Sequence, residues 1–315
     1  MSATRRPPSA SPGRLTALTL GALALAGCAR SSRMTDEHAG HAAETRTTTS
    51  TTTSTTTRTT TAGSLPAGAA EARARLERSP RHGAWAMVRT SAGDSVRAWV
   101  VYPERSTKAP VVLVVHEIFG LSPWVRAVAD QLAAEGFIAI APDLLTGKGV
   151  GGTADSTDAQ AAVAAVRALQ PAEVQARLLA VARYGMALPA ATQKYGIVGF
   201  CWGGTQAFQH AAFSPTLSAA VPYYGGVNTQ QVDLTKAKAA VFANYGENDA
   251  RVNATIPAAD SALKGAGVPW QYQVYDGAGH GFLRQQDGQN GANLAATQQA
   301  WPRTVAWFRQ HLEAR

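Results

Sequence analysis

The chain has 315 residues, of which 45% are hydrophobic and 16% charged, so it is long enough for one large α/β domain with additional segments. Its formal net charge of +8 is divided unequally, with +5 in residues 1–80 and +3 in residues 81–315. The folded part is therefore only mildly basic, and it has no cluster of Lys and Arg with interleaved aromatic residues. This composition argues against a nucleic-acid partner.

Residues 1–28 are similar to a bacterial lipoprotein signal peptide. Three arginines precede an apolar stretch from Leu15 to Ala26, which suits a signal peptide and is too short to span a bilayer as a helix. The stretch leads into Leu-Ala-Gly-Cys, which ends at Cys28 and resembles the lipobox whose cysteine is lipidated. We expect an exported protein, anchored by a lipid on Cys28 to a bacterial membrane and facing the periplasm or the cell exterior. An ordinary secretory signal is the alternative.

Residues 29–82 are expected to form a disordered tether. Residues 45–62 are almost all Thr with a few Ser and Arg, and such a segment has no apolar face to bury. The tether would hold the folded domain, residues 83–315, away from the membrane. His38 and His41 are too weak a motif for a metal site, and we predict neither a metal nor a cofactor.

From residue 83 onward, strand and helix patterns alternate. Strands are predicted at residues 96–102, 111–115, 137–141, 195–200, 219–224, 239–245 and 270–275. Helices are predicted at residues 124–135, 156–169, 172–188, 205–212, 256–265 and 299–313. This alternation predicts a mostly parallel central sheet with helices on both faces, as in the α/β-hydrolase fold. Ligands of such sheets bind beyond the carboxyl ends of the strands, so we looked there for functional residues.

The segment Gly199-Phe200-Cys201-Trp202-Gly203 lies between a predicted strand and a predicted helix. This is the context of a nucleophile elbow, in which a strained turn presents the nucleophile and small residues two positions away prevent clashes. The N-terminus of the following helix favours a thiolate and a developing oxyanion. We therefore predict that Cys201 is the catalytic nucleophile. A buried structural cysteine in a Gly-rich turn is the alternative.

Two further candidates follow later strands. Asp249 comes after the strand at 239–245, and His280 comes after the strand at 270–275. The order nucleophile, acid, histidine is that of the α/β-hydrolases. His280 would exchange a proton with Cys201, and Asp249 would orient the imidazole. Glu247 is an alternative to Asp249 for the acid.

The fourth candidate site is the loop after the strand at 111–115, which contains His116, Glu117 and Ile118. In this fold that loop normally supplies one N–H group to the oxyanion hole, so we predict that the backbone N–H groups of Ile118 and Trp202 bind the oxyanion. Glu117 could take the thiol proton or could hold the thiol neutral until substrate arrives. A solvated loop acid is the alternative.

Together, these segments resemble the dienelactone hydrolase family, also called carboxymethylenebutenolidases, over about residues 84–315. The resemblance rests on the segments His116–Leu121, Ala141–Leu144 and Gly199–Gly204, and on those containing Asp249 and His280. It implies a triad of Cys201, Asp249 and His280, a Glu117 that contacts the cysteine, no metal, and hydrolysis of enol-lactones or related esters.

The same resemblance implies a substrate-binding role for Arg284, which matches a family arginine that binds the substrate carboxylate. A second family arginine has no clear match, because neither Arg167 nor Arg177 is in register. The sequence as a whole predicts a lipid-anchored, monomeric hydrolase of small esters or lactones that works through an acyl-enzyme. The alternatives are a thioesterase or peptidase on the same triad, or a non-catalytic binding lipoprotein on a hydrolase scaffold.

Overall fold

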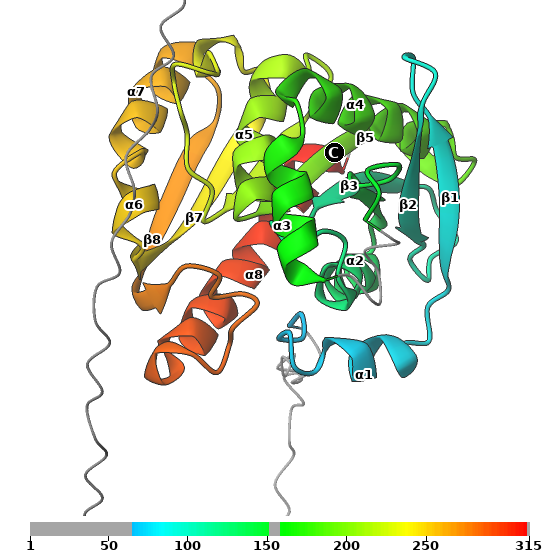
Figure 1. Ribbon diagram of the computed structural model, residues 1–315, viewed down its shortest axis with the longest axis horizontal. Coiled ribbons are helices and arrows are strands. Elements are labelled where there is room, and N and C mark those ends of the chain that lie inside the picture. Colours follow the sequence, from blue (N-terminus) through cyan, green and yellow to red (C-terminus); the bar gives the residue numbers. More distant parts are fainter. Residues whose placement is uncertain (1–64, 151–157, 314–315) are drawn as a thin grey trace, which may run out of the picture. The chain divides into compact units, whose positions relative to one another are not determined.

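The computed structural model describes residues 65–150 and 158–313 (Figure 1). The predicted signal peptide with Cys28, and the predicted tether as far as residue 64, lie outside the described residues. No helix in the described ranges is both long enough and apolar enough to cross a membrane.

The described chain forms one eight-stranded sheet with the order β1-β2-β4-β3-β5-β6-β7-β8. The strands are β1 (Gly83–Arg89), β2 (Ser95–Val101), β3 (Ala109–Val115), β4 (Ile138–Asp143), β5 (Ala191–Phe200), β6 (Ala219–Tyr223), β7 (Ala240–Asn248) and β8 (Trp270–Gly279). The pairs β1–β2 and β2–β4 are antiparallel, and every other pair is parallel. The prediction of a mostly parallel α/β-hydrolase sheet is therefore confirmed.

Helices cover both faces of this sheet. They are α1 (Ala72–Glu77), α2 (Pro123–Ala134), α3 (Ala159–Ala168), α4 (Pro171–Ala187), α5 (Trp202–Phe213), α6 (Ala250–Asn253), α7 (Ile256–Ala266) and α8 (Ala292–Leu312), with short 3-10 turns at η1 (Leu234–Lys236) and η2 (Gln289–Gly291). All seven residues of β3 are buried, as expected for a strand covered on both sides.

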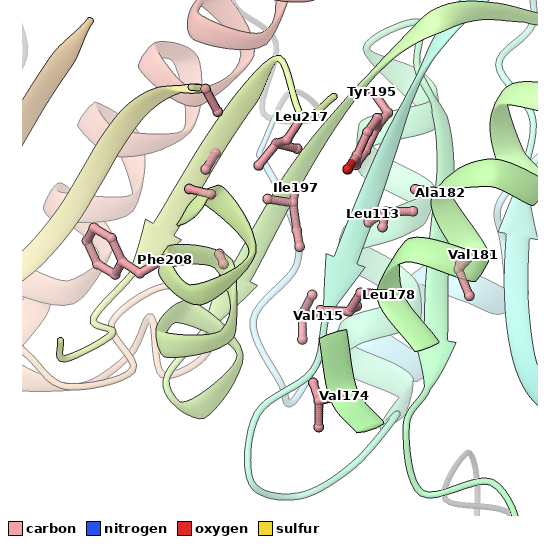
Figure 2. Close-up of a cluster of buried hydrophobic side chains, with 14 of the residues drawn as sticks. Leu113, Val115, Val174, Leu178, Val181, Ala182, Tyr195, Ile197, Phe208 and Leu217 are labelled. Carbon is pink, nitrogen blue, oxygen red and sulfur yellow. The ribbon is translucent and has the colours of Figure 1, made fainter. Parts of the chain in front are cut away.

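Two apolar clusters fill the space between the sheet and its helices. The first cluster joins the sheet to α3, α4, α5 and α7. Figure 2 shows part of it, with side chains from β3, α4, β5 and α5. The second cluster joins the sheet to α2 and α8 on the other face. Burial on both faces fixes the strands firmly, so the loops at their carboxyl ends have a rigid base.

Two elements differ from the sequence prediction. Strand β1 was not predicted, because it is an edge strand whose side chains are largely exposed, including Trp85 at 39% and Met87 at 61%. Helix α8 begins at Ala292 rather than at residue 299. Its first turns bury the polar side chains of Asn293 and Thr297, so they lack the apolar periodicity that marks a helix in sequence.

The segment from residue 65 to residue 82 also corrects the prediction, which placed it in a disordered tether. Instead it packs on the domain and includes α1, which lies against α2. Trp124 Nε1 donates to Ala67 O at 3.1 Å, and Arg81 forms an ion pair with the buried Asp130 at 2.7 Å. The folded part of the chain therefore begins near residue 65, and the predicted boundary at residue 83 is too late.

Candidate active site

Cys201 occupies the turn between β5 and α5. Its backbone has φ 55° and ψ −115°, a combination that a residue with a side chain rarely adopts. A Cβ on Gly199 would lie 2.0 Å from Gly203 O, and a Cβ on Gly203 would lie 2.5 Å from His116 O. Only glycine fits at both positions, so these residues allow the strained turn to form. The geometry is that of a nucleophile elbow.

His280 follows β8 and meets Asp249, which follows β7. The distance between His280 Nδ1 and Asp249 Oδ2 is 2.5 Å, and the Asp249 side chain is 7% exposed. Burial lowers the pKa of His280, but hydrogen bonds to Asp249 and to Cys201, together with their negative charge, outweigh it and raise the pKa to about 9. The imidazole is therefore held between the acid and the thiol.

Glu247, the alternative acid, points elsewhere. Its Oε2 accepts a hydrogen bond from the backbone N–H of Gly277 at 2.7 Å, and the residue is exposed. The carboxylate that contacts the imidazole is that of Asp249.

Glu117 is buried beside the same strand ends, at 4% exposure, so it is not a solvated loop acid. Its Oε2 lies 2.9 Å from Arg284 Nε. Burial raises the pKa of Glu117 to about 7, although the positive charges of Arg284 and His280 oppose this shift. The Arg284 guanidinium also lies 5.1 Å from the centre of the Phe119 ring. The structure thus brings Glu117 and Arg284 together as an ion pair.

The two predicted oxyanion donors flank the elbow. Trp202 is the first residue of α5, where backbone N–H groups have no acceptor within the helix. Its ring stacks on that of His116 at 5.4 Å, and His116 Nδ1 is bonded to the carbonyl oxygen of Glu117 at 2.7 Å. These contacts fix the loop that carries Ile118 against the start of α5.

Neither candidate for the second substrate arginine belongs to this site. Arg177 is buried and bonded to Asp94 at 2.7 Å and to the carbonyl oxygens of Leu144 and Thr146. Arg167 is exposed on α3. Arg177 therefore joins α4 to neighbouring loops.

The sequence did not indicate Tyr224, which lies at the end of β6. The residue is fully buried, and its ring centre lies 5.1 Å from that of His280. In the sequence it is one of two tyrosines after an apolar strand, which is the pattern of an ordinary core residue. Only its position after a strand set it apart.

Comparison with known proteins gives a consistent result. The family model of the dienelactone hydrolase family matches residues 96–312. A Salmonella typhimurium protein named "Putative carboxymethylenebutenolidase" is 34% identical over 233 residues, covering 70% of this chain and 85% of that protein. "Protein usf" of Aquifex pyrophilus is 33% identical over 231 residues, covering 70% of this chain and 95% of that protein.

Solved structures share the architecture. A Klebsiella pneumoniae structure described as a "Putative Dienelactone Hydrolase" aligns with a TM-score of 0.64 at 28% identity, covering 73% of this chain and 99% of that one. A dienelactone hydrolase from Anabaena variabilis aligns with a TM-score of 0.56 at 21% identity, covering 74% of this chain and 99% of that one, and this likeness concerns the fold alone.

Proposed function

Because the chain belongs to the dienelactone hydrolase family and is a hydrolase acting on esters or lactones, we propose that it cleaves them with a triad of Cys201, Asp249 and His280. The observation that carries this proposal is the 2.5 Å contact between His280 and Asp249 beside a cysteine in a nucleophile elbow. The substrate is a small ester or lactone, and the reaction passes through an acyl-enzyme.

In the first half of the reaction, the Cys201 sulfur attacks the carbonyl carbon of the substrate after its proton has passed to His280. The carbonyl oxygen becomes an oxyanion, which the backbone N–H groups of Ile118 and Trp202 bind. The C–O bond of the ester then breaks, and His280 gives its proton to the leaving alkoxide. A thioester on Cys201 remains.

In the second half, His280 accepts a proton from water, and the resulting hydroxide attacks the thioester. The thiolate of Cys201 leaves, and the carboxylic acid is released. In a lactone the alcohol and the acid belong to one molecule, so the opened ring stays attached to the enzyme until this step. A His280 pKa of about 9 supports the cycle, because the imidazolium persists at neutral pH until it protonates the alkoxide.

Glu117 and Arg284 have supporting roles in this proposal. Glu117 exchanges a proton with the thiol of Cys201, which is consistent with a carboxyl pKa of about 7 that allows both protonation states near neutral pH. Arg284 binds a carboxylate of the substrate, since its guanidinium lies at the edge of the site with the side chain 25% exposed.

The test is Cys201→Ala in the full chain, assayed against lactones, aryl esters, thioesters and peptides. We expect the variant to lose roughly 10⁴-fold or more in kcat toward esters or lactones, because no other group can form the covalent intermediate. In the wild type, rapid acid quenching followed by mass spectrometry should find the acyl group on the peptide that contains Cys201.

Glu247→Gln is the matched control, because it neutralises an exposed carboxylate close to the triad without touching the imidazole. It should retain wild-type turnover. Wild-type turnover of a lactone by Cys201→Ala would refute the triad. A preference for thioesters or peptides over esters would move the substrate class to the alternative hydrolases, and normal folding without any turnover in the wild type would favour a binding protein.

A further inference from the structure

Tyr224 directly follows β6, next to the turn that holds Cys201. The carbonyl oxygen of the preceding residue, Tyr223, accepts the N–H of Cys201 at 3.0 Å, and the N–H of Tyr224 donates to Asn244 O at 2.7 Å. Tyr224 has φ 39°, in the left-handed region that residues with side chains rarely occupy. The backbone is therefore strained at the residue whose side chain turns toward the site.

The Tyr224 ring is held in a fixed orientation by other rings. Its centre lies 5.1 Å from that of His280, 5.4 Å from that of Phe282 and 6.3 Å from that of Phe200. The side chain belongs to the second apolar cluster, and Cys201 packs against the edge of the same cluster. The hydroxyl therefore stays where these rings place it.

This hydroxyl is a buried hydrogen-bond donor with no partner among the described residues. Burial raises the pKa of Tyr224 well above its usual value, and negative charge on Glu117 and then on Cys201 raises it further, against Arg284. The phenol consequently keeps its proton throughout the working pH range. The groups that face it are Glu117 after β3, Cys201 before α5, Tyr223 in β6, and His280 and Arg284 after β8.

We propose that Tyr224 is a positioning residue whose hydroxyl donates a hydrogen bond to the negative charge that Glu117 and Cys201 carry. The inference rests on the proposed function, in which these two groups exchange a proton. A donor aimed at this pair stabilises the deprotonated form, so the site reaches its reactive state at lower pH. Full burial of Tyr224 favours this role over direct contact with substrate, because the side chain has no surface that substrate can reach.

The test is Tyr224→Phe in the full chain, which removes the hydroxyl and keeps the ring packing. The first readout is the rate of Cys201 alkylation by iodoacetamide as a function of pH, and the second is kcat/KM for an aryl ester as a function of pH. We expect the midpoints of both profiles to move upward by roughly one pH unit, the effect of one hydrogen bond to a charged group. On the acid side of the midpoint the rate should then fall about tenfold, and it should recover at higher pH.

Tyr245→Phe is the matched control. Tyr245 is equally buried, and its hydroxyl also has no partner in the described ranges, but it lies in the first apolar cluster on the other face of the sheet. Its removal should leave both pH profiles unchanged. Neither variant loses a hydrogen bond of the fold, so both should have a Tm no lower than that of the wild type.

Unshifted midpoints in Tyr224→Phe would overturn the inference. An equal fall in kcat/KM at every pH with an unchanged alkylation profile would also overturn it, because such a result places the hydroxyl on the substrate. Neither result touches the triad. The proposed function fails separately, if alkylation of Cys201 in the wild type leaves ester hydrolysis intact.

Discussion

At the scale of single residues, burial and neighbouring charge set the ionisation of the groups around Cys201. Burial raises the pKa of Glu117 to about 7, whereas its hydrogen bonds raise the pKa of His280 to about 9 in spite of burial. Between these values the carboxylate and the imidazolium are both charged. Below pH 7 the carboxyl is mostly protonated, and the Arg284 guanidinium beside it loses its counter-charge. The charged form of the site therefore belongs to a narrow, slightly alkaline range.

The raised pKa of Glu117 predicts how stability depends on pH. A carboxyl whose folded-state pKa lies above its unfolded value stabilises the fold fully below the unfolded value, and this stabilisation is lost as pH rises through the folded value. Relative to Glu117→Gln, the wild type should therefore lose stability between pH 4.5 and about 7. A shift of this size corresponds to roughly 3 kcal/mol. Urea unfolding of both proteins across this range measures the difference.

Glu247→Gln serves as the control for this experiment, because it changes an exposed carboxylate. Its unfolding free energy should follow that of the wild type at every pH. If Glu117→Gln also ran parallel to the wild type, the Glu117 carboxyl would not titrate differently in the folded and unfolded states.

The sequence located several of these residues because of a simple geometric rule. Parallel strands place their carboxyl ends at one edge of the sheet, so residues directly after separate strands meet there. Cys201, Asp249 and His280 follow β5, β7 and β8, and the structure brings them together. Tyr224 obeys the same rule, but its positive φ and its unpartnered hydroxyl are visible only in three dimensions.

At the scale of elements, the segment around α1 shows where sequence patterns fail. The α-helix has only six residues, and the segment attaches to the domain through backbone carbonyl groups and polar side chains. Such contacts leave no apolar periodicity in the sequence, so the segment resembled the Thr-rich tether before it. A bidentate ion pair anchors its end, where Arg81 Nη2 and Nε lie 2.7 Å and 3.1 Å from the two oxygens of Asp130.

Removing that ion pair should destabilise the protein. Asp130 is 2% exposed, so Arg81→Ala leaves a buried carboxylate with only the hydroxyl of Ser79 as a side-chain partner. We expect a loss of roughly 3 kcal/mol in the free energy of unfolding, measured by urea denaturation, because an uncompensated buried charge is costly. Limited proteolysis should also cut the segment around α1 faster than in the wild type.

Arg78→Ala is the matched control, since Arg78 is an exposed arginine of the same segment. It should change the free energy of unfolding by no more than about 0.5 kcal/mol. Equal stability of the Arg81→Ala and Arg78→Ala proteins would mean that this segment contributes little to the domain.

At the scale of the whole molecule, the alternation of patterns was enough to predict a parallel sheet with helices on both faces. It could not supply the strand order, because β4 lies between β2 and β3 and this arrangement leaves no mark on either strand's own sequence. It also missed the exposed edge strand β1, which lacks an apolar run. Burial determines which strands can be recognised, whereas long-range packing determines their neighbours.

The most basic part of the chain lies outside the folded domain, with a net charge of +5 in residues 1–80. We propose that Cys28 carries a lipid that anchors the protein to a bacterial membrane, and that the protein faces the periplasm or the cell exterior. In cells expressing the full chain, the wild type should incorporate a labelled fatty acid and sediment with membranes. Its mature N-terminus should be Cys28. The variant Cys28→Ser should lose the label and appear in the soluble fraction, because the lipid supplies the apolar surface that binds the bilayer.

The same variant separates the anchor from catalysis. Cys201, Asp249 and His280 all follow strands of the domain, and Cys28 precedes its first described residue. Hydrolysis by Cys28→Ser should therefore match the wild type in detergent solution, while Cys201→Ala should remain in membranes and fail to hydrolyse. A wild type found unlabelled in the medium, cleaved near residue 28, would instead favour an ordinary secretory signal. Membrane sedimentation of Cys28→Ser would show that some other part of the chain holds the protein there.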